Sequence, residues 1–443
     1  MSKVRRIRNT LQEYSLPLIF GVFAGLIVAN IDEHMYHHLV DFAPFGKGAK
    51  ILGHDITLHF LINDVFMVLF FGIAAKEITE SILPGGALNP PSKAINPLLG
   101  TIGGVLGPVL FFFLFASMFM AEGISDVGGS ILTAITPGAE VDVNRPEIIF
   151  RGWGIPTATD IALAWLVAKL VFGASHPAVS FLLLLAVADD AIGLGIIAIF
   201  YPDKAPAPMW LGLVAGGMLV SYIFRRMKVM RWTPYIFVGG LLSWIGLLEA
   251  HLHPALALVP IVPFLPGPKR DYGLFMEEEE VEVDENGNEV EDHEHEHAHS
   301  PLEEFEHQLK AFVDFGLFFF AFANAGVKLD TIGPITWVIL GSLIIGKVVG
   351  IFIFAYGGSL IGFPLPEGMR AKHLIVAGVV AGLGLTVALF VTGEAYPAAV
   401  QGVVSKASEL QGPAKMGAVF SAGAGILALI LGRLLKVHQN DDK

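Results

Sequence analysis

The chain has 443 residues, of which 54% are hydrophobic and only 16% are charged, and its mean hydropathy is +0.64. Soluble globular domains carry about 25% charged residues, so this composition excludes an ordinary soluble protein and favours a chain with lipid as its solvent. The absence of cysteine excludes disulfides and thiolate chemistry, and the net charge of −13 belongs mostly to one segment, since residues 277–296 hold 12 acidic side chains and no basic one.

Twelve apolar segments predict membrane-spanning helices, because about 20 helical residues cross a bilayer. A signal peptide would have a shorter apolar region and a small-residue cleavage site, so we expect the first segment to be an uncleaved span. The predicted spans are residues 16–31, 59–83, 95–120, 153–172, 178–200, 208–224, 234–250, 254–267, 308–329, 334–357, 371–393 and 413–435.

Lysine and arginine indicate which ends of these spans face the cytoplasm, since short cytoplasmic loops carry an excess of both. They gather at the N-terminus, in the loop after the sixth span and in the C-terminal tail. An even number of spans places all three on the cytoplasmic side, so residues 32–58 and 121–150 face outward. The basic residues concerned are Lys3, Arg5, Arg6, Arg8, Arg225, Arg226, Lys228, Arg231, Arg433 and Lys436.

Two connecting segments have distinctive compositions. Residues 276–300 are acidic, histidine-rich and low in complexity, which predicts a disordered cytoplasmic loop between spans eight and nine. Its alternating histidines could bind a divalent metal weakly or buffer protons, but a solvated spacer is the simpler interpretation. Residues 44–60 combine glycine-rich turn signals with alternating apolar residues, which indicates a short outward β-hairpin or an irregular loop.

The most informative charges lie at the predicted centre of the membrane. Asp189 and Asp190 are at the midpoint of the fifth span, where a charged side chain costs roughly 2.5–3.5 kcal/mol on insertion scales. Two adjacent carboxylates in a low dielectric do not both ionise easily, so we expect the pair either to hold protons or to bind a cation that replaces them. That competition is the chemistry of an antiporter. A purely structural pair that only neutralises a lysine is the alternative.

Glycine and proline interrupt two further spans. Gly152, Gly154 and Pro156 precede Asp160 in the fourth span, and Gly382 and Gly384 lie at the centre of the eleventh. Irregular backbone at membrane depth is tolerated where it lines a cavity or is buried in protein, and two such helices in corresponding halves of a transporter indicate a midplane binding site.

Interrupted helices leave partial positive charge at their inner N-termini and partial negative charge at their inner C-termini. Asp160 could neutralise the N-termini. Lys347, at the centre of the tenth span, could neutralise the C-termini, pair with Asp189, or itself carry a proton.

Several motifs resemble the NhaA family of sodium/proton antiporters. They are LINDVFMVLFF at 61–71, GWGIPTATDIA at 152–162, LLAVADDAIG at 184–193, FAFANAGV at 320–327, LIIGKVVGI at 343–351 and HLIVAGVVAGLGLTVALF at 373–390. The resemblance runs from about residue 15 to residue 435, apart from the acidic segment, and the combination of PTATD with a central ADD is its most specific part.

The resemblance implies an all-α fold of twelve helices with two inverted three-helix repeats, spans 3–5 and 10–12, whose interrupted helices cross near the middle. It implies that Asp189 and Asp190 bind sodium or lithium and carry protons, that Thr159 and Asp160 lie at the crossing, and that Lys347 pairs with the first aspartate. It further implies electrogenic exchange of cytoplasmic sodium for external protons, no cofactor, a location in the bacterial inner membrane, and a homodimer formed through an outward hairpin.

The family also responds to pH through a cytoplasmic charged cluster. Glu77, Glu306 and His307 match that cluster, and His253 matches a position where the family often has histidine. The segment KEITES at 76–81 departs from the family pattern, because Glu80 stands where a basic residue is expected. This departure places the pH range of activation in question.

These expectations divide the chain into eight regions. They are a cytoplasmic N-terminus, an interface part in three pieces, two core repeats, the acidic loop and a tail. The regions run 1–15, 16–91 (spans 1–2), 92–205 (spans 3–5), 206–268 (spans 6–8), 269–307 (acidic loop), 308–331 (span 9), 332–435 (spans 10–12) and 436–443.

Three other functions compete with antiport. An intramembrane aspartyl protease needs two aspartates from different helices, whereas Asp189 and Asp190 share one. A cation channel uses rings of carboxylates from several subunits, and interrupted helices favour alternating access instead. A proton-coupled transporter of organic anions would want arginine at depth, and no arginine lies in any span centre. We therefore expect a transporter, not an enzyme, with no nucleic-acid partner.

Overall fold

Long apolar helices make up most of the protein, because a backbone in hydrocarbon can satisfy its polar groups only within itself. The computed structural model describes residues 15–46, 48–83, 91–120, 126–137, 141–202, 205–267, 300–397 and 405–437. Within these residues, six helices are long and apolar enough to cross a membrane, and two further bent pairs raise the number to eight. The chain is thus a helical membrane protein.

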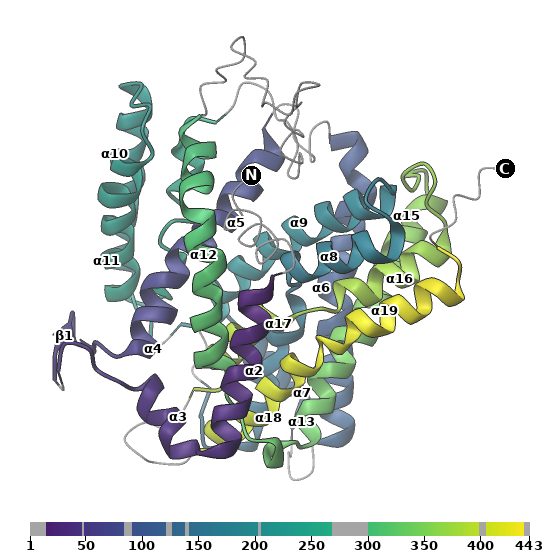
Figure 1. The fold of residues 1–443 in the computed structure, drawn as a ribbon, viewed down its shortest axis with the longest axis horizontal. Coiled ribbons are helices and arrows are strands. Elements are labelled where there is room, and N and C mark those ends of the chain that lie inside the picture. The colour runs from purple at the N-terminus through teal and green to yellow at the C-terminus, as the bar shows by residue number, and fades with distance from the viewer. Residues whose placement is uncertain are drawn as a thin grey trace, which may run out of the picture.

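Several long helices change from α to π geometry partway. Figure 1 colours the elements in chain order. Their bounds are α2 Leu16–Ile31, α3 Glu33–Val40, β1 Lys50–Ile51, β2 His54–Asp55, α4 Leu58–Phe60, η1 Leu61–Phe66, α5 Met67–Ile82, α6 Pro91–Phe119, α7 Val127–Ile135, η2 Pro146–Thr157, α8 Ile161–Phe172, α9 Pro177–Phe200, η3 Pro208–Trp210, α10 Leu211–Arg226, η4 Tyr235–Gly240, α11 Leu241–Glu249, η5 Pro254–Leu256, η6 Val262–Phe264, α12 Pro301–Ala325, η7 Leu329–Thr331, α13 Pro334–Gly341, η8 Ser342–Gly346, α14 Lys347–Ile351, η9 Phe352–Tyr356, α15 Gly357–Leu360, α16 Ala371–Ala381, α17 Leu385–Ala395, α18 Lys406–Phe420 and α19 Gly423–Leu434.

The predicted eighth span, residues 254–267, is not a continuous helix. It contains only the short 3-10 helices η5 and η6 and the turns between them. Four prolines explain the difference, because each lacks the N–H that an α-helix needs and its ring clashes with the preceding turn. They are Pro254, Pro260, Pro263 and Pro266. Two short helices that the sequence did not predict, α3 and α7, lie in the loops 32–58 and 121–150.

Glycines let α6 lie directly against the helix formed by η8 and α14. A side chain at Gly350 would meet the carbonyl oxygen of Gly103, and one at Gly107 would meet that of Gly346. Small residues on both partners let two helix backbones approach closely, which is how helices commonly associate in lipid. This contact joins the third predicted span to the tenth.

A two-residue antiparallel ladder lies in the segment 44–60. Lys50 pairs with Asp55 and Ile51 with His54. The ladder projects from one edge of the molecule, away from the helices (Figure 1). Ile51 and Leu52 at its tip are exposed.

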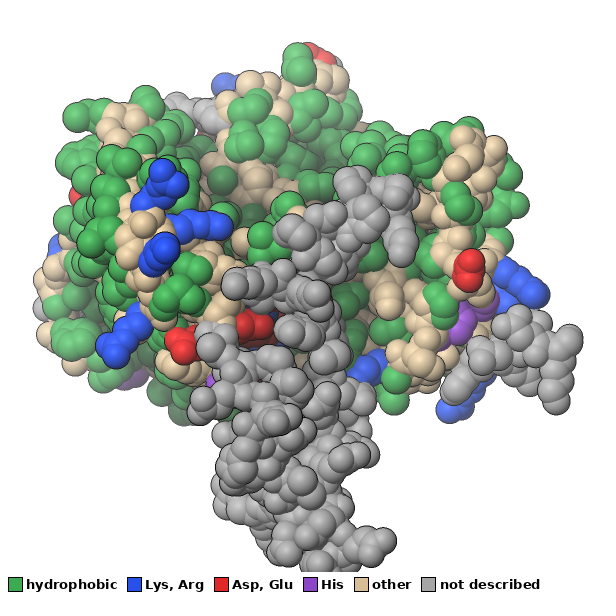
Figure 2. Space-filling view, turned by 90° about the horizontal axis from the view of Figure 1, so that it is seen from above, with side chains coloured by type: hydrophobic (Ala, Val, Ile, Leu, Met, Phe, Trp, Pro, Cys, Tyr) green, Lys and Arg blue, Asp and Glu red, His purple; other side chains and the backbone are tan. Residues whose placement is uncertain are grey.

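The surface combines an apolar rim with localised charge. Seen from above, basic side chains lie toward both the left and the right of this face, and hydrophobic side chains occupy much of its border (Figure 2). Arg225 and Arg226, which end α10, are exposed, as is Lys228 in the turn that follows. The basic N-terminal residues and the acidic histidine-rich segment, both singled out by the sequence, lie outside the described residues.

Candidate functional site

Two broken helices meet at the centre of the candidate site. The η2–α8 pair is bent by 52° and the α16–α17 pair by 51°. At the breaks, the Asp160 N–H donates to the Leu383 carbonyl at 2.5 Å, and the Thr159 hydroxyl donates to the Ala381 carbonyl at 2.8 Å. The two interruptions predicted from Gly152, Gly154, Pro156, Gly382 and Gly384 therefore lie against each other.

Asp160 caps two half-helices at once. Its Oδ1 accepts a hydrogen bond from the Leu163 N–H of α8 at 3.1 Å, and its Oδ2 accepts one from the Thr386 N–H of α17 at 3.2 Å. Both helix N-termini carry partial positive charge, so one buried carboxylate compensates both. Asp160 thus has the surroundings that the sequence suggested for it.

Asp189 lies in α9 and is held by two neighbouring elements. The Lys347 ammonium forms an ion pair with its Oδ2, and the Thr159 hydroxyl lies 2.8 Å from the same oxygen. Lys347 also donates to the Thr157 carbonyl at 2.5 Å, which is the C-terminal end of η2. The lysine therefore contacts both an aspartate and a helix C-terminus. The sequence analysis gave these two contacts as alternatives.

The aspartate pair retains oxygens with no protein partner. Within the described residues, Oδ1 of Asp189 and Oδ1 of Asp190 are buried and accept no hydrogen bond. Asp190 is 8% exposed, while Asp189 is 1% exposed and Lys347 fully buried. Buried carboxylate oxygens without partners are costly unless a proton or a cation satisfies them, and oxygen is the ligand that hard cations prefer.

Two tyrosines that the sequence analysis missed support η2 from either side. The Tyr201 hydroxyl donates to the Arg151 carbonyl at 2.6 Å and accepts from the Gly154 N–H at 2.9 Å, and the Tyr396 hydroxyl donates to the Ile149 carbonyl at 2.6 Å. A side chain at Gly154 or Gly152 would collide with these two hydroxyls. Burial raises the pKa of Tyr201, which keeps its hydroxyl a donor. A signal for both tyrosines is present in the sequence, because each is followed by proline just beyond the end of a helix.

The residues predicted to respond to pH fall into two separate places. Lys76 lies 2.6 Å from Glu80 and also forms an ion pair with Glu306, which in turn contacts Lys310 at 3.3 Å. Glu77 is on the same helix as Lys76, and His307 follows Glu306 on α12. The acidic side chain at position 80 is thus matched by a lysine one helical turn before it.

His253 takes part in a different contact. Its Nδ1 accepts from the Ala255 N–H at 3.2 Å, so its Nε2 carries the proton and donates to Glu394 Oε1 at 3.2 Å. Glu394 in α17 and Lys415 in α18 were not singled out from the sequence. Lys415 could have been, because it lies inside the predicted span 413–435, as Lys347 lies inside the tenth.

Comparison with known proteins identifies the family. A family model described as Na+/H+ antiporter 1 matches residues 6–134 and 118–431. The chain belongs to the NhaA family of Na+/H+ antiporters. It is 50% identical to the Na(+)/H(+) antiporter NhaA of Geobacter sulfurreducens over 438 residues, which cover 98% of this chain and 100% of the relative.

Other NhaA proteins match over equally complete lengths. The NhaA of Desulfitobacterium hafniense is 50% identical over 447 residues, covering 100% of this chain and 99% of the relative. The NhaA of a Jannaschia species is 39% identical over 467 residues, covering 98% and 99%. The NhaA match therefore extends over the broken helices, the aspartate pair and the lysine.

Proposed function

We propose that this NhaA protein is an electrogenic antiporter that exports sodium or lithium from the cytoplasm in exchange for external protons. The observation that carries the proposal is the buried Asp189–Asp190 pair, whose free oxygens lie beside two crossing broken helices. A cation and protons compete for the same carboxylates, so binding of one releases the other.

In this mechanism Asp190 binds the cation together with Asp189, and the Thr159 hydroxyl is an additional oxygen beside them. Cation binding competes with Lys347 for Asp189, because both neutralise the same carboxylate. Electrogenic exchange needs more than one proton for each sodium. Asp190 supplies one of these protons, and Asp189 or Lys347 supplies the second.

We propose that alternating access arises from movement of the two core repeats around this site. Support comes from the helices themselves: Leu16–Ile31, Tyr235–Glu249 and Pro301–Ala325 add to the eight candidates, and the irregular segment 254–267 is the twelfth crossing of this proposal. Spans 3–5 and 10–12 then form inverted repeats, each with one broken helix. The N- and C-termini lie in the cytoplasm, and the protein belongs in the bacterial inner membrane.

A response to pH belongs to the same proposal. Lys76 of α5 forms ion pairs with Glu80 on the same helix and with Glu306 on α12, and Glu306 also contacts Lys310. Protonation of Glu306 would remove the ion pair between the two helices, and protonation of Glu80 would remove the ion pair within α5. The His253–Glu394 pair links the loop after α11 to the broken helix α17.

The test uses everted membrane vesicles from cells that lack their own sodium/proton antiporters. Respiration establishes a pH gradient, a dye reports it by quenching, and NaCl, LiCl, KCl or choline chloride is added between pH 6.5 and pH 9. We expect sodium and lithium to restore the fluorescence, and Asp190→Asn to abolish this effect. Asp126→Asn, which changes a surface helix cap, is the control. A well-expressed parent protein that restores fluorescence with no cation would contradict antiport.

A further inference from the structure

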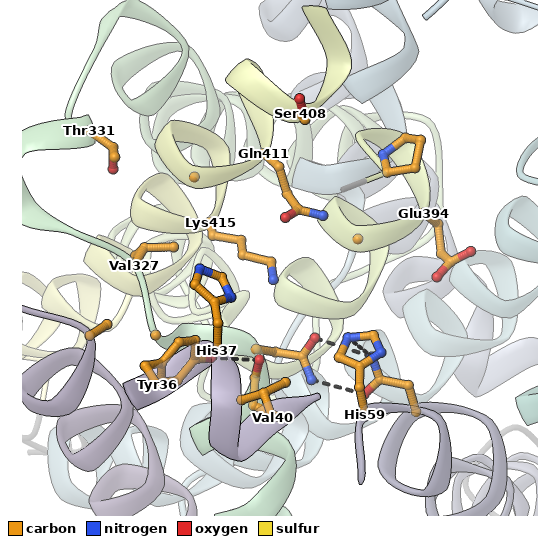
Figure 3. A pocket seen from close by; sticks show the side chains of 18 of the residues that line it. Tyr36, His37, Val40, His59, Val327, Thr331, Glu394, Ser408, Gln411 and Lys415 are labelled. Atoms are coloured by element: carbon orange, nitrogen blue, oxygen red, sulfur yellow. Dashed lines mark hydrogen bonds between the residues drawn. The ribbon is translucent and has the colours of Figure 1, made fainter. Parts of the chain in front are cut away.

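A polar cavity lies apart from the aspartate pair. It has a volume of about 700 Å³, and its lining comes from the ends of α2 and α3, from η2, and from α17 and α18. None of Asp160, Asp189, Asp190 and Lys347 lines it. Figure 3 shows Lys415 and Gln411 of α18 turned into this space, with Glu394 on the opposite side.

Lys415 is a buried lysine that has no partner among the described residues. It is 8% exposed, and no hydrogen bond or ion pair joins it to any other described residue. Its position is fixed by α18, which packs closely on α13: the Thr336 hydroxyl donates to the Pro413 carbonyl at 2.7 Å, and Gly417 leaves no room for a side chain against Thr336. An unpaired buried charge is costly, so the lysine either gives up its proton or is compensated by an anion.

The carboxylates that line the cavity are already engaged or exposed. Glu394 accepts from His253, and Glu33 pairs with Lys328 at 3.2 Å. Asp41, at the end of α3, is exposed. Arg151, which also lines the cavity, has a buried Nε without a hydrogen-bond partner in the described residues. The cavity thus holds two cationic groups that no carboxylate of the described chain neutralises by direct contact.

Gln411 supplies a second donor beside Lys415. The two are four residues apart on α18 and so lie on one face of the helix. Ser408 shares this face, but its hydroxyl already donates to the Ser405 carbonyl at 2.9 Å. An ammonium and an amide N–H₂ side by side, in a polar space large enough for hydrated ions, are donors of the kind that bind a small anion.

We propose that Lys415 and Gln411 bind a small monovalent anion, such as chloride or a simple carboxylate, in this cavity. The bound anion neutralises Lys415 and so removes a positive charge from the space between the described outer loops and the broken helix α17. The binding step stands on its own. Its consequence, easier entry of external cations, rests on the proposed antiport function.

The test measures thermal unfolding of the purified, full-length protein in detergent, without sodium and at constant ionic strength. Choline gluconate is replaced stepwise by choline chloride, choline bromide or choline acetate. We expect a saturable rise in Tm with a small anion, lost or weakened about tenfold or more in Lys415→Gln, since hydrogen bonds to charged groups contribute about 1.5–3 kcal/mol. Lys406→Gln, an exposed lysine of the same helix, should retain it.

The chloride, bromide and acetate titrations separate a halide site from a site for carboxylates. Gln411→Leu keeps the charge of Lys415 and removes one donor, so it should weaken the anion-dependent rise in Tm without abolishing it. This variant tests the proposal if Lys415→Gln does not fold. An equal rise in Tm in Lys415→Gln would show a general salt effect and overturn the proposal, as would no rise in the parent protein. Sodium-dependent antiport in gluconate medium is measured separately, so failure of the anion site and failure of antiport are distinguishable.

Discussion

At the scale of single residues, the Asp189–Lys347 ion pair lies at the centre of the candidate site. Both side chains are buried, and Lys347 also serves the carbonyl end of η2. Removing one partner of a buried ion pair leaves an uncompensated charge, which costs about 3–5 kcal/mol, whereas replacing both partners costs far less.

We therefore expect Lys347→Gln to lower the thermal stability of the purified protein clearly, and Asp189→Asn combined with Lys347→Gln to recover most of it. The measurement is the Tm followed by intrinsic tryptophan fluorescence in detergent at pH 7. Lys169→Gln changes a half-buried lysine stacked on Trp165 and is the control for the loss of a cation in a span. A double variant less stable than the Lys347 variant would contradict the pairing.

At the scale of helices, Asp160 joins two half-helices through one carboxylate. A lost helix cap costs about 1 kcal/mol, and here two caps depend on one side chain. We expect Asp160→Ala to destabilise the protein about twice as much as Asp126→Ala, which removes the single surface cap of α7. Thermal unfolding of both variants provides the comparison. Equal effects would show that the α17 contact contributes nothing.

The glycine contact between α6 and α14 gives a second prediction at this scale. Gly350→Ala places a methyl group against the Gly103 carbonyl, and overpacking of this kind costs about 1–3 kcal/mol. A methyl group at Gly357, seven residues after Gly350, meets nothing within 4 Å, so Gly357→Ala should be neutral or slightly stabilising, because alanine is the better helix former. The Tm of each variant is compared with that of the parent protein: Gly350→Ala should lower it, and Gly357→Ala should leave it unchanged or raise it slightly.

At the scale of the whole molecule, we expect the β1–β2 ladder to join two copies of the chain. It projects from the helices and exposes Ile51 and Leu52 at its tip. Deleting residues 49–56 should convert a homodimer into a monomer while leaving antiport measurable, because the ladder does not contact the aspartate pair. Light scattering in detergent reports the mass, and a dimer that persists would place the interface elsewhere.

The acidic segment offers a complementary prediction. Its residues 277–299 lie outside the described structure, and their composition favours a solvated spacer. Deleting them should leave the dependence of antiport on pH unchanged between pH 6.5 and pH 9. A shifted profile would instead indicate that the histidines of this segment titrate as part of the response to pH.

The sequence by itself determined the membrane class, the broken helices and the aspartate pair. Hydropathy is a local property, and glycine, proline and buried carboxylates are visible in any single segment. The NhaA resemblance added roles to Thr159, Asp160 and Lys347, which remain proposals. The prediction of a continuous helix at residues 254–267 was wrong for a reason that is also local. The segment is apolar, but its four prolines prevent an α-helix.

Only the tertiary structure decided which distant residues meet. Asp160 caps α17 across 226 positions, Thr159 reaches Asp189 across 30, and Lys347 reaches Asp189 across 158. It also separated His253 from the Lys76 cluster and left Lys415 without a partner among the residues that the structure describes. Such contacts depend on how helices pack in three dimensions, because side chains far apart in the chain become neighbours only after the backbone interruptions and glycine contacts fix the helix positions.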